Sequence, residues 1–299
     1  MCLVNPLPMN ACDRPSPAQP LPCTPTRRLR LPHGEIGYDD TGGSGPLVLA
    51  IPGMGDLRSQ YRALRPWLWQ AGYRVVTMDI RGHGQTSAVW DDYSAWAVAQ
   101  DALALLAHLQ AGPAVILGNS FAAGSALWAA HEAPQQVRGV VLLGPVVRDG
   151  QPPWWMRPAV ALGLSGPWRV TFWLCVWDRL FPLRKPADHA RARAALAANL
   201  RQPERMAALR AMIGLSKSDT EALVARSQVP ALVVMGSRDP DFPDPAAEAR
   251  WLGQQLGTAP VLIDGAGHYP HLEAPEQLAP ALLSFLARTA PVQNAQSGR

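Results

Sequence analysis

The chain is 299 residues long and 48% hydrophobic, with a net charge of +4. This apolar content is sufficient for a folded core and excludes a wholly disordered chain. Strictly apolar stretches such as 102–107 are far shorter than the roughly 18 to 20 residues of a membrane-spanning helix, so no membrane span is expected. Nearly all of the positive charge is arginine dispersed along the chain, without a nucleic-acid-binding motif, so no nucleic-acid partner is expected.

Residues 1–26 are rich in proline and carry Cys2, Cys12 and Cys23, three of the four cysteines. Proline interrupts each apolar run there and no basic region precedes one, so the segment lacks the pattern of a secretory signal peptide. The cysteines show no spacing typical of zinc or redox sites. We expect a disordered tail, a cytoplasmic protein and no metal.

Short apolar strands alternate with helices through most of the chain. A hairpin is expected over residues 28–38, with its turn near His33 and Gly34. Further strands are expected at 47–51, 74–78, 114–117, 137–143, 231–235 and 260–263, and helices at 93–109, 120–131, 245–256 and 274–287. This alternation predicts an α/β protein with a mostly parallel, doubly wound sheet covered on both faces.

Residues 147–226 interrupt the alternation. They contain no convincing strand, two helical segments at 187–200 and 203–213, and five of the eleven tryptophans, Trp154, Trp155, Trp168, Trp173 and Trp177. We expect a helical cap inserted into a core formed by residues 27–146 and 227–299. Three uses are open for the tryptophans and for Phe172, Leu174, Val176, Leu180 and Phe181: a wall for an apolar substrate, packing within the cap, and adhesion to lipid.

The segment 114–124 joins an apolar strand to a helix through Ser120. A sharp strand–serine–helix turn needs small residues two before and two after the serine, because the backbone there approaches neighbouring elements and leaves the hydroxyl exposed. Gly118 and Ala122 occupy those positions. The simpler alternative is a serine that only caps a helix. A nucleophilic serine also needs a base to take its proton and an acid to orient the base.

The candidate base is a histidine late in the chain. For the order serine, acid, histidine, only His189, His268 and His271 follow the nucleophile's helix, and His189 lies in the insertion. His268 follows a strand and the loop 264–267, where a parallel sheet presents side chains at the carboxyl ends of its strands. His271 remains the alternative.

The candidate acid lies in the loop after strand 231–235. Asp239 is close to the strand end and precedes Pro240, which stiffens its backbone. Asp241 remains the alternative acid, and an Asx-type turn is the simpler interpretation of the loop.

With these motifs in this order, the chain resembles the α/β-hydrolase fold superfamily, in its branch of soluble hydrolases with a helical cap after the sixth strand. The resemblance extends over residues 28–290. It rests on Pro52-Gly53-Met54-Gly55, Asp79-Ile80-Arg81-Gly82-His83-Gly84, the Ser120 turn, Asp239 and Gly267-His268. Ala122 stands where the family usually has glycine, and Pro52 where it often has histidine.

The resemblance implies that Ser120, Asp239 and His268 form a catalytic triad. It also implies that the backbone N–H groups of Met54 and Phe121 form the oxyanion hole, as a glycine-flanked loop and a first helical turn permit. The segment 79–84 corresponds to a structural turn, so Asp79, Arg81 and His83 are not expected to react.

A serine at the turn disfavours the family's dehalogenase and epoxide-hydrolase reactions and favours acyl transfer through an acyl-enzyme, which requires no cofactor. The expected activity is therefore hydrolysis of a carboxylic ester or related acyl compound, with a small, apolar acyl substrate as the partner. One alternative is a carbon–carbon bond hydrolase of the meta-cleavage-product type, which the string Gly118-Asn119-Ser120-Phe121 resembles. The other is a non-catalytic ligand-binding protein with the same fold.

Overall fold

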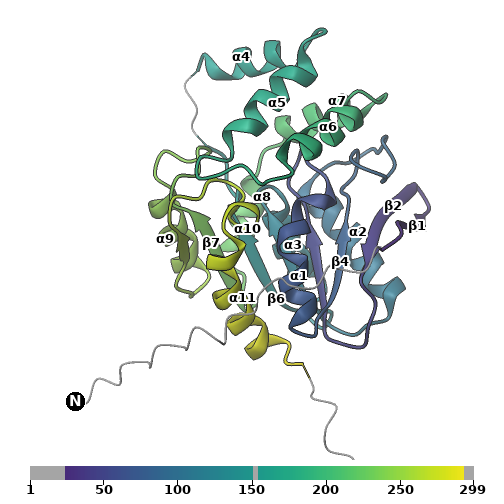
Figure 1. Cartoon of the computed structure of the whole chain (residues 1–299), viewed down its shortest axis with the longest axis vertical. Helices are drawn as coiled ribbons and strands as arrows, with labels where there is room; N and C mark the ends of the chain where they lie inside the picture. The colour runs from purple at the N-terminus through teal and green to yellow at the C-terminus, as the bar shows by residue number, and fades with distance from the viewer. Residues whose placement is uncertain (1–23, 151–153, 293–299) are drawn as a thin grey trace, which may run out of the picture.

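The computed structural model describes residues 24–150 and 154–292, and its centre is an eight-stranded sheet (Figure 1). In spatial order the strands are β1, β2, β4, β3, β5, β6, β7 and β8. Their bounds are β1 Arg27–Leu31, β2 Gly34–Asp40, β3 Leu47–Ile51, β4 Arg74–Met78, β5 Ala114–Asn119, β6 Val137–Leu143, β7 Ala231–Gly236 and β8 Val261–Ile263. Strands β1 and β2 form the expected hairpin and β2 pairs antiparallel with β4. The remaining pairs are parallel, which confirms the mostly parallel sheet.

Helices cover both faces of the sheet. The inner strands β3, β5 and β7 are buried at every residue, as continuous apolar strands of a parallel sheet must be. On one face lie α2 (Ala95–Leu109), α3 (Ala122–Glu132) and α8 (Ser218–Val224). The opposite face is covered by the 3₁₀ helix η2 (Arg58–Ala63), α1 (Arg65–Gln70) and α11 (Pro275–Thr289). Helix α9 (Pro245–Gln255) packs against β7. The sheet is therefore doubly wound.

Between β6 and β7, the regular elements in the described residues are all helices. They are α4 (Met156–Gly163), α5 (Arg169–Arg179), α6 (His189–Leu200), α7 (Arg205–Gly214) and α8. Helices α4 to α7 gather at one end of the molecule, at the top of Figure 1. Their buried side chains, such as Trp177 and Leu200, pack together with Tyr269 and Leu272 from the region after β8. Through this cluster, α5 and α6 pack against the segment that follows β8.

Several expectations compare directly with these bounds. Strands β3, β4 and β6 span the expected residues, whereas η2, α1, α4, α5 and the short α10 (Pro270–Glu273) were not expected. The proline-rich tail expected over 1–26 lies outside the described residues up to residue 23. Within the described residues, every helix is too short or too polar to cross a membrane.

Candidate active site

Ser120 lies in the turn between β5 and α3. Its φ of +56° is in the left-handed region, a conformation that costs a residue with a side chain about 1–3 kcal/mol. The turn is tight because a Cβ at Gly118 would stand 2.1 Å from the carbonyl oxygen of Ala122, so only glycine fits there. The N–H of Ser120 donates to the carbonyl oxygen of Leu143 at 2.9 Å, which ties the turn to β6. Strain held in place by the neighbouring strand is typical of a functional position.

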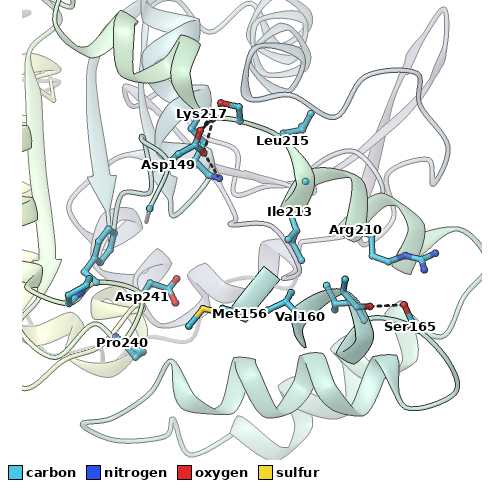
Figure 2. A pocket seen from close by; sticks show the side chains of 17 residues that line it. Asp149, Met156, Val160, Ser165, Arg210, Ile213, Leu215, Lys217, Pro240 and Asp241 are labelled. Atoms are coloured by element: carbon cyan, nitrogen blue, oxygen red, sulfur yellow. Dashed lines mark hydrogen bonds and ion pairs between the residues drawn. The ribbon is translucent and has the colours of Figure 1, made fainter. Parts of the chain in front are cut away.

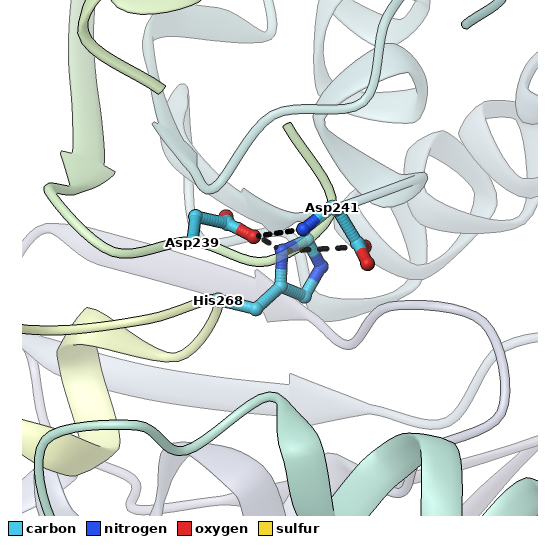
Figure 3. Close-up of side chains that lie close together, drawn as sticks. All are labelled: Asp239, Asp241 and His268. Carbon is cyan, nitrogen blue, oxygen red and sulfur yellow. Dashed lines mark hydrogen bonds and ion pairs between the residues drawn. The ribbon is translucent and has the colours of Figure 1, made fainter. Parts of the chain in front are cut away.

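His268 and Asp239 are brought together by the loops after β8 and β7 (Figure 3). His268 Nδ1 lies 2.8 Å from Asp239 Oδ2, and both residues are only 2% exposed. The carboxylate accepts a hydrogen bond from Nδ1–H, so Nε2 is the ring nitrogen left to take up a further proton. The N–H of His268 donates to the carbonyl oxygen of Leu180 at 3.1 Å. The histidine is thus anchored to the helical segment as well as to the sheet.

Asp241, the alternative acid, stands on the other side of the same ring. Its Oδ2 lies 3.6 Å from His268 Nδ1, beyond hydrogen-bond length, and its side chain is 42% exposed. Its N–H donates to Asp239 Oδ1 at 3.0 Å. Oxygen and nitrogen atoms of Asp239, Asp241 and His268 all lie within 4.8 Å of one another, a spacing that a metal ion would also accept. A metal bound at Nδ1, however, would have to displace the hydrogen bond to Asp239.

The pKa of His268 reflects both burial and its two acidic neighbours. Burial alone would lower the pKa of the imidazole, but the charges of Asp239 and Asp241 and the hydrogen bond to Asp239 outweigh it and raise that pKa to about 9. Each of these interactions favours the imidazolium form. The ring is therefore a stronger base than an ordinary histidine.

Within the described residues, no hydrogen bond joins Ser120 Oγ to a ring nitrogen of His268. The two loops are connected instead through Asn119, the residue before the serine. Its amide nitrogen donates to the carbonyl oxygens of Leu143 at 2.8 Å and His268 at 3.2 Å. Its Oδ1 accepts from Gln60 Nε2 at 3.2 Å. This buried amide was not singled out from the sequence, because its partner lies 149 residues away.

The loop 52–55 passes directly beside Ser120. A Cβ at Gly53 would lie 3.0 Å from the Cβ of Ser120. Across residues 24–150 and 154–292, no hydrogen bond uses the N–H of Met54 or of Phe121 as its donor. Two backbone donors near Ser120 are therefore available to an incoming oxygen atom, and Phe121 lies at the N-terminus of α3, where the helix dipole favours negative charge.

Two side chains hold this loop from opposite sides. The N–H of Gly55 donates to Nε2 of His83 at 3.0 Å. The indole N–H of Trp173, on α5, donates to the carbonyl oxygen of Gly55 at 2.9 Å. A Cβ at Gly55 would overlap the Trp173 ring at 2.1 Å, so the tryptophan requires glycine beneath it. Helix α5 is thereby attached to the loop that carries Met54.

His83 acts on the loop as a hydrogen-bond acceptor. Its Nδ1 lies 2.8 Å from the carbonyl oxygen of Arg81, so Nδ1 carries the proton and Nε2 can accept from Gly55. Burial lowers the pKa of His83 to about 4, which keeps the ring neutral. Arg81 itself makes a bidentate pair with Asp101, and Asp79 accepts from the backbone N–H groups of Arg58 and Gln85. These contacts are structural and tie segment 79–84 to its neighbours, in agreement with the structural turn that the family resemblance implies.

Two further buried carboxylates support the site. Asp56 accepts from the indole N–H of Trp177 at 3.1 Å, and burial raises its pKa. Glu273 accepts from the N–H of Gly267, beside His268, at 2.8 Å and from the N–H of Leu183 at 2.9 Å. Both carboxylates join the helical segment to a loop of the site. Nothing in the sequence pattern pointed to either.

The other late histidines lie in different surroundings. His271 is fully buried and stacks on Tyr61 at a centroid distance of 4.9 Å, and burial lowers its pKa to about 3. Neither of its nitrogens has a hydrogen-bond partner among the described residues. His189 stacks on Trp177, and its Nε2 lies 3.1 Å from Asp178. Neither ring is paired with Asp239.

Comparison with known proteins identifies the family. The model of the alpha/beta hydrolase fold matches residues 46–275. The chain belongs to the α/β-hydrolase fold family. Membership of this family supports a hydrolase activity, and it agrees with the resemblance seen in the motifs.

Individual relatives of this α/β hydrolase are distant. An uncharacterized protein of Mycobacterium tuberculosis is 34% identical over 127 residues, which cover 42% of this chain but only 37% of that protein. The 3-oxoadipate enol-lactonase 2 of Acinetobacter baylyi is 23% identical over 74% of this chain and 81% of its own. The solved structure of a thermophilic esterase from Thermogutta terrifontis has a TM-score of 0.74 at 23% identity, covering 88% of this chain and 99% of that one. At this identity the likeness establishes the fold.

A cavity of about 1190 Å³ lies beside the candidate active site (Figure 2). Most of its wall is apolar and comes from Met156, Val160, Ala161, Leu164, Ile213, Leu215 and Phe242, with Asp149, Arg210, Lys217 and Asp241 as charged members. Asp241 lines the cavity, whereas Ser120 and His268 do not. Of the three uses left open for the tryptophans, a wall for this cavity is not seen, since no described tryptophan lines it. Trp177 is instead buried in packing.

Proposed function

We propose that the protein is a cofactor-free serine hydrolase that cleaves a carboxylic ester or a related acyl compound through an acyl-enzyme. The observation that carries the proposal is the buried 2.8 Å hydrogen bond between His268 Nδ1 and Asp239 Oδ2. Because Asp239 is bound to Nδ1, the other ring nitrogen, Nε2, points away from Asp239. The raised pKa of His268 makes this nitrogen a stronger base. Ser120, strained at the β5–α3 turn, supplies the hydroxyl that such a base serves.

In the proposed reaction His268 Nε2 takes the proton of Ser120 as the Ser120 oxygen attacks the carbonyl carbon of the substrate. Asp239 holds the ring in the required tautomer and stabilises the imidazolium. His268 then gives the proton to the leaving alcohol, and the acyl group stays on Ser120. The same nitrogen then takes a proton from water as the water oxygen attacks the acyl-enzyme, and it returns that proton to the Ser120 oxygen when the acyl–oxygen bond breaks and the acid leaves.

The oxyanion of each tetrahedral intermediate is assigned to the N–H groups of Met54 and Phe121. Both donors lack a partner among the described residues, and His83 and Trp173 hold the loop that carries the first of them. Preorganised donors of this kind lower the barrier because they need no rearrangement as charge develops.

Residues 147–226 are proposed as a cap over this site. Helices α4 and α7 contribute the apolar wall of the cavity next to Asp241, and such a wall suits the hydrocarbon part of an acyl substrate. We therefore expect apolar acyl esters to be better substrates than short, charged ones.

Stopped-flow hydrolysis of p-nitrophenyl esters of increasing acyl length tests the proposal. We expect a burst of p-nitrophenol equal to the enzyme concentration, trapping of the acyl group by hydroxylamine, and no burst in Ser120→Ala. Asp239→Asn is expected to lower kcat by about 10³- to 10⁴-fold, because the ring loses its orienting anion. Turnover without an acyl-enzyme, or cleavage of a vinylogous diketone with no esterase activity, would contradict the proposed function.

A further inference from the structure

Helix α4 and the residues at its two ends expose large apolar side chains to solvent. Trp154 is 86% exposed, Leu162 65%, Trp155 53% and Trp168 51%. These four residues are called the aromatic face below. Scattered apolar residues are ordinary on a protein surface, but a contiguous group that includes three tryptophans marks an interaction site. Figure 1 places α4 at the end of the molecule farthest from α11.

The four residues belong together because the chain folds back after α4. The indole N–H of Trp168 donates to the carbonyl oxygen of Leu162 at 3.1 Å, which fixes the tryptophan at the last turn of the helix. Trp154 and Trp155 immediately precede the first turn. Exposed apolar side chains therefore stand at both ends of the helix.

The opposite side of α4 is apolar too. Leu164 is buried and Val160 half-buried, and Met156, Val160 and Leu164 line the cavity beside Asp241. A helix with apolar side chains on both its inner and its outer side is normally buried. In α4, the inner side packs against α5 and lines the cavity, whereas no described residue covers the outer side, which carries the aromatic face.

The charge of the segment indicates what covers the face. Residues 150–177 contain no aspartate or glutamate, and their charged residues are Arg157 and Arg169. Exposed Arg169 follows Trp168 directly. Tryptophan and arginine together favour the boundary between water and hydrocarbon, where the indole ring is buried and the guanidinium meets lipid phosphate. A protein partner of this face would need acidic groups set among apolar ones, whereas an anionic bilayer offers both over its whole surface.

We propose that the aromatic face docks onto the surface of an anionic phospholipid bilayer, with α4 lying in the plane of the interface. The tryptophans enter the headgroup region and Arg169 contacts lipid phosphate. Because the opposite side of α4 forms a wall of the cavity, α4 lies between the cavity and the bilayer when the protein is docked. Docking is independent of the proposed ester hydrolysis, since it requires neither Ser120 nor His268.

Sedimentation with vesicles tests the proposal on the full chain carrying Ser120→Ala, so that lipid turnover cannot interfere. We expect binding to vesicles of phosphatidylcholine and phosphatidylglycerol, weaker binding to phosphatidylcholine alone, and further weakening by added salt. The double variant Trp154→Ser/Trp168→Ser should lose at least about tenfold in affinity for the mixed vesicles. Trp96→Ser is the matched control, because Trp96 is 44% exposed but lies on α2, and it should bind unchanged.

Three results would overturn the proposal: no binding to the mixed vesicles, equal binding to both vesicle types, or equal loss in the Trp96 control. Sedimentation velocity without lipid adds a fourth. A dimer that the double variant dissociates would mean that a second copy covers the face. A second assay separates the docking proposal from the proposed ester hydrolysis. It measures turnover of a water-soluble ester by the wild type and by Trp154→Ser/Trp168→Ser, both with Ser120 intact. If turnover is retained while vesicle binding is lost, docking stands; if neither protein turns over the ester, the proposed function fails and the docking result is unaffected.

Discussion

Asn119 donates a hydrogen bond from its side-chain amide to the carbonyl oxygen of His268, 3.2 Å away. The same amide nitrogen contacts the carbonyl oxygen of Leu143 at the end of β6. One buried side chain, next to the proposed nucleophile, therefore fixes the backbone of the proposed base. This relationship holds the two proposed reacting residues in place, although among the described residues no hydrogen bond joins their side chains directly.

Asn119→Leu should reduce both stability and activity. The substitution leaves the carbonyl oxygen of His268 and the Gln60 amide without this partner, at about 1–3 kcal/mol for an unsatisfied buried group, and it frees the His268 loop. We expect kcat to fall at least about tenfold with KM little changed. Gln60→Leu is the control, because it removes the contact to Asn119 Oδ1 and keeps the bond to His268. Equal kcat values for Asn119→Leu and the wild type would mean that Asn119 does not position the base.

Asp241→Asn should shift the pH dependence of kcat/KM. The base acts in its neutral form, so the rate is expected to rise with pH through the pKa of His268, which its acidic neighbours raise to about 9. Removing the Asp241 charge lowers that pKa, and the rising limb therefore moves to lower pH. The plateau should change little, in contrast to the large loss expected for Asp239→Asn. A plateau lowered as much as by Asp239→Asn would make Asp241 the orienting acid.

Trp173→Phe should lower kcat by loosening the loop that carries Met54. The variant keeps an aromatic ring over Gly55 but loses the donor to its carbonyl oxygen. We expect about a tenfold loss in kcat, with the free energy of unfolding lowered by about 1 kcal/mol. Trp177→Phe provides the comparison, since it removes a donor from buried Asp56 and should cost more stability and less activity. The opposite order would contradict a role for Trp173 at the oxyanion hole.

His271→Phe should make the protein more resistant to acid. Burial holds the pKa of His271 at about 3 in the folded state, below its ordinary value of 6.5. The unfolded chain therefore binds a proton first, so the folded state is fully stable above pH 6.5 and loses stability as the pH falls from there toward 3. Phenylalanine preserves the stacking on Tyr61 and has no such proton. Urea unfolding at several pH values should show the variant gaining up to roughly 1.4 kcal/mol per pH unit over the wild type in that window; parallel pH profiles would rule this out.

The strands of the sheet and the candidate reacting residues could be predicted from the sequence, because both are marked by local patterns of residues. Continuous apolar runs marked β3, β4 and β6, and the spacing of Gly118, Ser120 and Ala122 marked a turn in which the structure puts Ser120 at positive φ. Asp239 and His268 were found because each follows a strand closely. Their separation of 2.8 Å depends on two neighbouring strands ending at the same edge.

The supporting contacts depend on partners far apart in the chain, and no local pattern marks them. Trp173 contacts Gly55 across 118 positions, and Trp177 contacts Asp56 across 121. Helices α4 and α5 were also missed; Pro158 stands in the first turn of α4, and Pro167 shortly precedes α5. The sequence did show that aromatic residues gather there, but only the structure separates buried Trp177 from exposed Trp154 and Trp168.

Fluorophosphonate labelling of the purified protein, read by intact mass and by fragment ions, tests the central claim most directly. Ser120 is predicted to carry a single adduct, which is absent in Ser120→Ala and strongly slowed in His268→Ala. Ser125→Ala is the matched control, because Ser125 lies on the following helix and its buried hydroxyl has no partner among the described residues, and it should label like the wild type. An adduct on any other serine, or none on the folded protein, would contradict the assignment of Ser120 as an activated nucleophile.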